Sequence, residues 1–158
     1  MTERIHEPEL WSVLEKEKNP LLLYGMGNGA DMIIDELEKR GLCFADTFAS
    51  NGFVRGQLFH GKKVLSLSQA EEKYGEFVVL MTFAVHDEKT LGFVKELSKK
   101  HRLYSPTVPV AGKELFTLEY IKKNEERFDC AFSLLADEKS KSTFLDVLNF
   151  KVSGKPKY

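Results

Sequence analysis

The stretch Leu21 to Asp31, read as LLLYGMGNGAD, decides the fold that the sequence predicts for this chain. Its first four residues are apolar or aromatic, which is typical of a strand buried on both faces of a sheet. Three closely spaced glycines follow, and a helical pattern begins after them. A strand that ends in glycines and opens a helix lets the backbone approach an anion or a ribose, with helix N–H groups directed at it. The stretch therefore predicts a nucleotide-binding turn, and the alternative is a tight turn that binds nothing.

The spacing of the glycines fits two kinds of turn. Gly25, Gly27 and Ala30 fit the Gly-x-Gly-x-x-Gly/Ala dinucleotide pattern, in which a small third residue lets the helix pack closely on the strand. Gly25, Gly27 and Gly29 also fit the Gly-x-Gly-x-Gly turn that cradles S-adenosylmethionine in Rossmann-like methyltransferases. In either turn, we expect the backbone N–H groups of Gly27, Asn28, Gly29 and Ala30 to hold an anion.

Composition excludes several classes of partner. The chain has 158 residues, a charged fraction of 30% and a net charge of -1, so it offers no bulk attraction to nucleic acid or to an anionic membrane. No apolar run approaches the ~20 residues of a membrane span, and residues 1–8 are too polar for a signal peptide. We therefore expect one domain, with or without an appendage, in a cytoplasmic protein without nucleic-acid or membrane partners.

The cysteines and histidines do not form a motif. Cys43 and Cys130 are far apart, and the four histidines are scattered without ligands at metal-binding spacing. We predict two buried free thiols, no metal site and no catalytic residue within this chain.

Up to about residue 112 the sequence alternates between strand and helix patterns. Strands are predicted at 42–49, 77–83 and 102–104, with a short one at 63–65, and helices at 7–14, 30–40, 68–74 and 86–101. The helix at 68–74 is predicted to begin with a capping box from Ser68 to Glu71. Strand-helix-strand units of this kind are right-handed and build parallel sheets. The predicted fold class is α/β, a three-layer Rossmann-like parallel sheet of about four to five strands with a C-terminal helical appendage.

The pattern changes after residue 112, because only helical segments follow. We predict a Rossmann-like nucleotide-binding-type domain at 1–112 and a helical appendage packed on it at 113–150. Residues 151–158 (KVSGKPKY) are polar and broken by glycine and proline, with nothing to pack. We interpret them as a linker to a missing downstream domain.

Candidate ribose contacts lie after the second predicted strand. In the dinucleotide pattern, an acid about 20 residues beyond the glycines accepts the ribose hydroxyls. Asp46 is at about that distance but in mid-strand, whereas the strand end is Ser50-Asn51. Ser50 and Asn51 can still bond a ribose, although without the charge assistance of a carboxylate.

Three further candidates come from the ends of other strands. Arg55 lies in a loop that should flank the glycine turn, where it is either an anion clamp or a solvated side chain beside two phenylalanines that plug the core edge. Thr82 ends the strand at 77–83 and should face the ligand crevice. His86 opens the next helix, where it either contacts a ligand phosphate or is exposed to water.

Five stretches together resemble the amino-terminal region of some bacterial FkbM-family methyltransferases. They are YGMGNGAD, FASNGFVRGQLFHGKKV, EKYGEFVVLMTFA, SPTVPVAG and SLLADEKSKSTF. The resemblance implies a parent protein in which a Rossmann-like domain precedes a separate S-adenosylmethionine-dependent O-methyltransferase domain, usually acting on sugars or other small metabolites. The catalytic and methyl-donor residues would lie in that downstream domain, which is also the expected partner.

Three hypotheses for this chain remain open. The first is a module that binds a nucleotide, a nucleotide-sugar or a similar phosphorylated ligand, and the second is a ligand-free structural or docking domain for the catalytic domain. The third is an NAD-dependent oxidoreductase-type domain, which is disfavoured because Lys123 follows Tyr120 one residue too early for a Tyr-x-x-x-Lys pair. Autonomous methyl transfer is disfavoured as well, because Leu23 stands where that class usually carries an acid.

Overall fold

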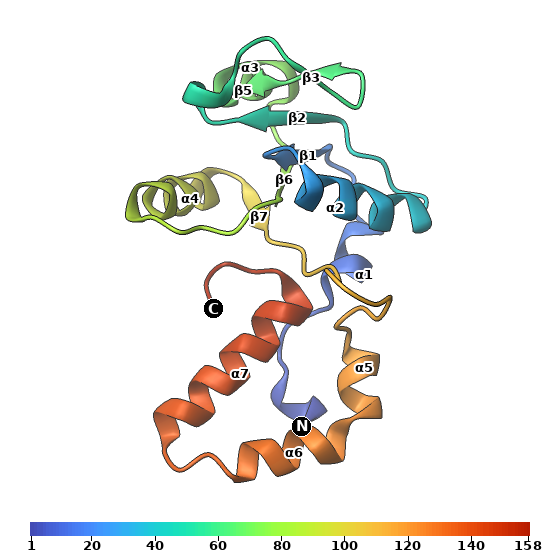
Figure 1. Ribbon diagram of the computed structural model, residues 1–158, viewed down its shortest axis with the longest axis vertical. Coiled ribbons are helices and arrows are strands. Elements are labelled where there is room, and N and C mark those ends of the chain that lie inside the picture. Colours follow the sequence, from blue (N-terminus) through green and yellow to red (C-terminus); the bar gives the residue numbers. More distant parts are fainter. The chain divides into compact units, whose positions relative to one another are not determined.

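The computed structural model describes residues 1–158, which form two compact units. The sheet unit comprises Glu17–Ser105, and the helical unit combines Met1–Lys16 with Pro106–Tyr158. This grouping differs from the predicted boundaries, because the first 16 residues join the C-terminal helices and not the sheet. Figure 1 labels the elements of both units.

The sheet unit contains a five-stranded parallel sheet, so the predicted fold class is confirmed. Its elements are β1 (Leu21–Tyr24), α2 (Asn28–Lys39), β2 (Asp46–Ala49), η2 (Asn51–Phe53), β3 (Leu58–Phe59), β4 (Lys62–Lys63), β5 (Leu65–Ser66), α3 (Leu67–Tyr74), β6 (Val78–Met81), α4 (Glu88–Lys100) and β7 (Arg102–Tyr104). The strand order is β5-β2-β1-β6-β7, and β3 and β4 form a separate antiparallel hairpin. The strand order therefore reverses between β1 and β6, the neighbouring strands in which Tyr24 pairs with Met81.

Helices cover both faces of this sheet. Leu22 and Tyr24 belong to a buried cluster with Ala70 of α3 and with Val94 and Leu97 of α4. Alternate residues of a strand point to opposite faces, so Leu21 and Leu23 face the other way. The right-handed crossover from β1 to β2 places α2 on that second face, and Figure 1 shows α2 and α4 on either side of β1 and β6.

The ends of two helices correct or confirm sequence predictions. Gly41 has φ +69, and the N–H of Leu42 donates to the carbonyl of Leu37, so the predicted glycine cap of α2 is confirmed. The predicted cap at Ser68 is wrong by two residues. The capping box is formed by Ser66 and Gln69, each side chain bonding the other residue's backbone N–H.

The second strand is shorter than predicted. Residues 42–45 lie outside it, because the carbonyls of Phe44 and Ala45 accept hydrogen bonds from the Lys62 ammonium at 3.1 and 2.7 Å. Both cysteines are exposed, which corrects the prediction of buried thiols. Cys43 lies in this non-strand segment, and Cys130 lies on α6 (Glu125–Ser133), a helix without a fully buried residue.

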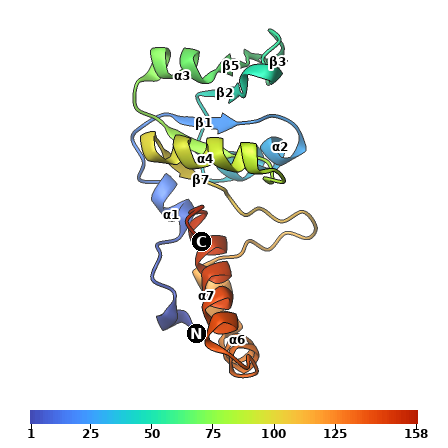
Figure 2. The ribbon, with the colours of Figure 1, turned by 90° about the vertical axis from the view of Figure 1, so that its left-hand side faces the viewer.

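The helical unit is assembled from both ends of the chain. Its elements are η1 (Thr2–Arg4), α1 (Leu10–Leu14), α5 (Leu118–Lys123), α6 (Glu125–Ser133) and α7 (Glu138–Ser153). Met1, Ile121, Leu148 and Val152 form its buried cluster. In Figure 2, which is turned by 90° from Figure 1, α7 lies alongside the N-terminal segment. None of the helices in the chain is long and apolar enough to cross a bilayer.

The C-terminal tail packs, contrary to the expectation of an unpacked segment. Helix α7 continues to Ser153, and Val152 is buried. Beyond the helix, Glu7 accepts hydrogen bonds from Lys155 at 2.5 Å and from the Tyr158 hydroxyl at 2.8 Å, and it pairs with Lys157 at 2.6 Å. The positive charges of Lys155 and Lys157 are complementary to Glu7, which lies far away in sequence. The composition of the tail alone therefore does not indicate this contact. The predicted downstream domain stays a prediction.

Candidate functional site

The glycine turn joins β1 to α2 as the sequence predicts. Gly25 has φ +102, and a Cβ there would lie 2.7 Å from both the Phe83 ring and the Thr82 hydroxyl. A Cβ on Gly29 would overlap the carbonyl oxygen of Thr82. These two glycines therefore let the turn pack against the end of β6. Gly27 has φ +112 but open space around it, so its backbone conformation alone requires glycine.

Helix α2 begins without a side-chain cap. Gly27 is its N-cap residue and has no side chain that could accept a hydrogen bond from the first turn. The other two helices of the sheet unit are capped, α3 by Ser66 and α4 by Asp87. An uncapped N-terminus leaves backbone donors and the positive end of the helix dipole available to an anion.

A cavity of about 330 Å³ lies next to this turn, at the carboxyl ends of β1, β2 and β6. It is lined by Tyr24, Gly25 and Met26 after β1, by Ala49, Ser50 and Phe53 after β2, by Phe83, Ala84 and His86 after β6, and by Asp87 and Thr90 of α4. In open α/β sheets, ligands bind outside the carboxyl ends of the strands, at the point where the strand order reverses. This cavity lies at that point.

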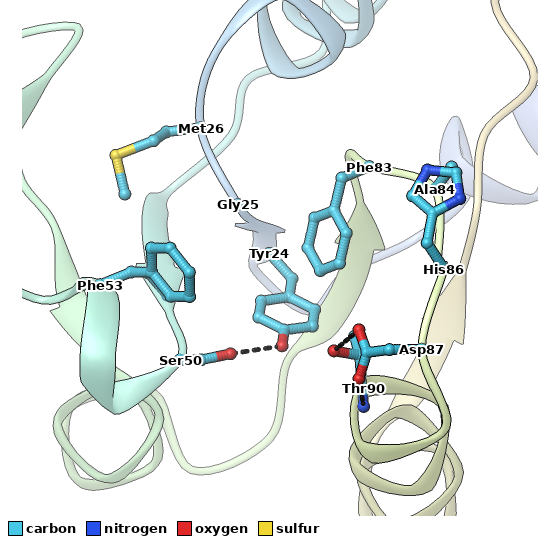
Figure 3. A pocket seen from close by; sticks show the side chains of 11 residues that line it. Tyr24, Gly25, Met26, Ser50, Phe53, Phe83, Ala84, His86, Asp87 and Thr90 are labelled. Carbon is cyan, nitrogen blue, oxygen red and sulfur yellow. Dashed lines mark hydrogen bonds between the residues drawn. The ribbon is translucent and has the colours of Figure 1, made fainter.

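Tyr24 forms the buried side of the cavity. Its side chain is 2% exposed and stacks on Phe48 with ring centroids 4.9 Å apart. Its hydroxyl shares a 2.7 Å hydrogen bond with Ser50, drawn in Figure 3. Burial raises the pKa of the Tyr24 phenol; the hydrogen bond with Ser50 opposes this shift and the nearby Asp87 charge adds to it. Tyr24 is therefore a neutral hydroxyl group at physiological pH.

Two aromatic side chains stand at the mouth of the cavity. Phe53 is 66% exposed and Phe83 is 37% exposed, and Figure 3 shows them on either side of the Tyr24 ring. The Phe83 ring meets Tyr24 edge to face, with centroids 4.8 Å apart. Together these two rings offer apolar surface to a molecule that enters the cavity.

Asp87 brings the only carboxylate among the lining residues. As the N-cap of α4 it accepts hydrogen bonds from the Thr90 backbone N–H at 2.8 Å and from the Thr90 hydroxyl at 2.7 Å. These bonds, the backbone one first, lower the pKa of Asp87 below its usual value. The cavity thus combines aromatic walls with an ionised carboxylate, the hydroxyl groups of Tyr24, Ser50 and Thr90, and the imidazole of His86.

Three of the ten predicted site residues line the cavity, namely Gly25, Ser50 and His86. Four others, Gly27, Asn28, Gly29 and Ala30, form the beginning of α2. The structure thus brings these seven residues to the same end of the sheet.

The remaining three predicted residues lie outside the cavity lining. Asn51 begins η2, and Arg55 is exposed. Thr82 was predicted to face the ligand crevice, but it is buried and does not line the cavity. Its hydroxyl donates instead to the carbonyl of Tyr24 at 3.0 Å, which links the end of β6 to β1. The alternative for this loop is contradicted at Phe53, which is too exposed to plug the core edge, whereas Phe59 is half-buried and Arg55 is exposed as that alternative predicted.

Asp46 is the first residue of β2 and not a mid-strand residue. It therefore lies at the opposite end of the strand from the cavity. Burial disfavours its charge, but hydrogen bonds from Lys73 at 2.7 Å and from the Tyr74 hydroxyl at 2.5 Å outweigh this effect, and its pKa is lowered. Asp46 is thus a structural carboxylate that anchors α3.

The loop between β2 and β5 lies beside the glycine turn, as predicted. Gln57 contacts the Met26 sulfur at 3.6 Å, and the His60 ring nitrogen contacts the Asp31 carboxylate at 2.7 Å. His60 is the only non-glycine residue with positive φ, which is +46. The hairpin of β3 and β4 is therefore fastened to the first turn of α2.

Comparison with known proteins identifies a related fold. A scan against protein-family models gives no match, and neither does a search of the curated proteins. Among solved structures, the chain is similar to methyltransferase FkbM from Methylobacillus flagellatus, with a TM-score of 0.58 and 17% sequence identity. The similarity covers 99% of this chain but 43% of that protein, so the chain spans less than half of its length. At this identity, the likeness establishes a common fold.

Proposed function

We propose that this chain is a binding domain that takes a nucleotide, a nucleotide-sugar or a related phosphorylated ligand and serves an S-adenosylmethionine-dependent methyltransferase. The observation that carries the proposal is the cavity where the strand order reverses, directly beside the uncapped start of α2. Its volume of about 330 Å³ is at the lower end of the range of small-molecule pockets. It therefore suits one part of such a ligand and leaves the rest outside.

Each part of the ligand has a matching group. The N–H groups at the start of α2 suit an anionic phosphate, because an uncapped helix N-terminus favours negative charge. Ser50 lies at the end of β2, where a ribose hydroxyl is bound in dinucleotide folds, and it is already paired with Tyr24. Gly27, with open space around it, leaves the backbone accessible at the turn.

The link to methyl transfer rests on the fold shared with methyltransferase FkbM and on the sequence resemblance to the amino-terminal region of that family. On this proposal, the chain is the amino-terminal part of a longer enzyme. A downstream domain performs the methyl transfer, and no residue of this chain is catalytic.

Isothermal titration tests the ligand claim, with S-adenosylmethionine, NAD and UDP-glucose each added to protein whose folding is checked by circular dichroism. We expect at least one of them to bind at millimolar concentration or below. The Ser50→Ala variant should bind several-fold more weakly, whereas Ser68→Ala, at an exposed position on α3, should bind like the wild type. Absence of binding by all three compounds would rule out the ligand claim.

A ligand-free docking domain is the second candidate. It is favoured by one observation, namely that Gly25 and Gly29 are required by packing within the fold even without a ligand. Its signature is stable association with a separately expressed methyltransferase domain, measured by co-purification, together with no heat in the titrations above. A monomer that binds a nucleotide and does not associate with the methyltransferase domain would exclude the docking function.

A further inference from the structure

We infer that the cavity takes the ring end of the ligand, a planar heteroaromatic base that carries an exocyclic amino group, held between Phe53 and Phe83. The anionic end of the ligand then lies outside the cavity, at the start of α2. This inference rests on the proposed function and deepens it, because it names the ligand class and its orientation.

The aromatic mouth supports a flat occupant. Phe53 and Phe83 are 66% and 37% exposed and lie on either side of the Tyr24 ring, as Figure 3 shows. Tyr24 is fixed by stacking on Phe48 and by its hydrogen bond with Ser50. Stacking on an aromatic side chain covers apolar surface on both partners and strengthens the binding of a base by about tenfold or more per ring.

The charge of the lining indicates which end of the ligand enters. The cavity contains the Asp87 carboxylate and no lysine or arginine. A phosphate inside it would meet a negative charge without a lysine or arginine to offset it, whereas the start of α2 offers donors outside. The ring is therefore the part that enters.

Asp87 also distinguishes between rings. Both of its oxygens already accept from Thr90, but each carboxylate oxygen has a second lone pair that accepts from an amino group. Adenine, guanine and cytosine carry such an amino group, whereas uracil carries none, and its one free ring donor, N3–H, is flanked by two carbonyl oxygens that a carboxylate repels. Because Asp87 is exposed, solvent screens this effect, and we expect a preference of about three- to tenfold.

The test uses the whole chain, labelled with nitrogen-15 for NMR titration with adenosine, uridine and ribose 5-phosphate. Adenosine should shift the amide signals of Phe53, Phe83 and Ala84 and bind at least threefold more tightly than uridine. Phe53→Ala and Phe83→Ala should each weaken adenosine binding about tenfold and leave ribose 5-phosphate binding unchanged. Leu58→Ala, at an apolar residue that is 67% exposed and outside the cavity lining, is the matched control.

Asp87→Asn isolates the charge, because asparagine caps a helix as well as aspartate does. It should keep the thermal unfolding midpoint of the wild type and reduce the preference for adenosine over uridine to less than twofold. Equal affinity of the wild type for both nucleosides, or tight binding of UDP-glucose that ignores Phe53→Ala and Phe83→Ala, would overturn this inference while the proposed function stands. If no compound shifts any amide signal and the calorimetric titrations also detect no binding, this inference and the ligand-binding part of the proposed function are both wrong.

Discussion

Gly29 marks the point where α2 and β6 approach so closely that no side chain fits between them. In Gly29→Ala the new methyl group would overlap the carbonyl oxygen of Thr82, which is held in place because the hydroxyl of the same residue bonds Tyr24. We predict a loss of about 1–3 kcal/mol of stability, since the backbone must shift to relieve the overlap. Urea unfolding followed by circular dichroism measures the loss.

Gly92 gives the matched control within the same unit. It lies in the interior of α4, and a Cβ there would meet no other atom within 4 Å. Gly92→Ala should therefore raise stability by about 0.5–1 kcal/mol, because alanine loses less backbone entropy in a helix. If both alanine variants shifted stability in the same direction, close packing at Gly29 would not be the cause.

Among the elements, α3 shows how a cap is specified by geometry. The Ser66 hydroxyl accepts from the Gln69 backbone N–H at 3.2 Å, and the Gln69 side chain accepts from the Ser66 backbone N–H at 2.9 Å. Ser66→Ala removes the hydrogen bond from the Gln69 backbone N–H to the Ser66 hydroxyl and should cost about 1 kcal/mol of stability. Ser68→Ala loses only one exposed contact, with the Ser66 hydroxyl, and should cost less than half as much in the same urea experiment. Equal costs for the two variants would contradict the observed cap position.

At the scale of the whole molecule, Glu7 joins the two ends of the chain within the helical unit. Its hydrogen bonds with Lys155, Lys157 and Tyr158 lower its pKa from the usual 4.5 to about 2, with Lys155 as the largest cause. A lowered pKa in the folded state stabilises the protein above pH 4.5, and this stabilisation fades as the pH falls toward 2. Glu7→Gln should therefore cost about 1–2 kcal/mol at pH 7, a value limited by solvent screening of the lysines, and the difference from the wild type should shrink below pH 4.

Trp11 offers a direct measurement, because it is the only tryptophan and is 3% exposed within the helical unit. Its fluorescence during urea unfolding at pH 7 and at pH 3 compares the stability of Glu7→Gln with that of the wild type. Glu138→Gln is the control, since Glu138 is 90% exposed and pairs only with its helical neighbour Lys141. A pH-independent difference between Glu7→Gln and the wild type would show that the carboxylate charge is not responsible.

The sequence predicted the parts that depend on local pattern. The all-apolar run Leu21 to Tyr24 and the glycines after it predicted β1, the turn and α2, because burial and positive φ restrict residue choice locally. The cavity could be predicted only in part. Phe83 and Asp87 lie close to Tyr24 and Ser50 because β6 pairs with β1, and no local sequence pattern predicts that proximity. The spacing of Asp87 and Thr90 does indicate a helix cap.

The helical unit was the hardest part to predict from sequence. Glu7 and Lys155 are 148 positions apart, and neither lies in a motif. The sequence pattern predicts a helix of the sheet domain at residues 7–14 and an unpacked linker at 151–158. Only the complementary charge and the shared helical cluster bring them into one unit.

The discontinuous helical unit also sets an order of events at the ribosome. Residues 17–105 form the sheet unit as one uninterrupted segment, so its partners are all available once Ser105 has emerged. Residues 1–16 are made before the sheet unit, yet Glu7 and Met1 find their partners only after residues 106–158 have been synthesised. At typical translation speeds this delay is about 3–10 s. During it Glu7 and Met1 remain without these partners, so we expect chaperone binding to be most useful in this interval.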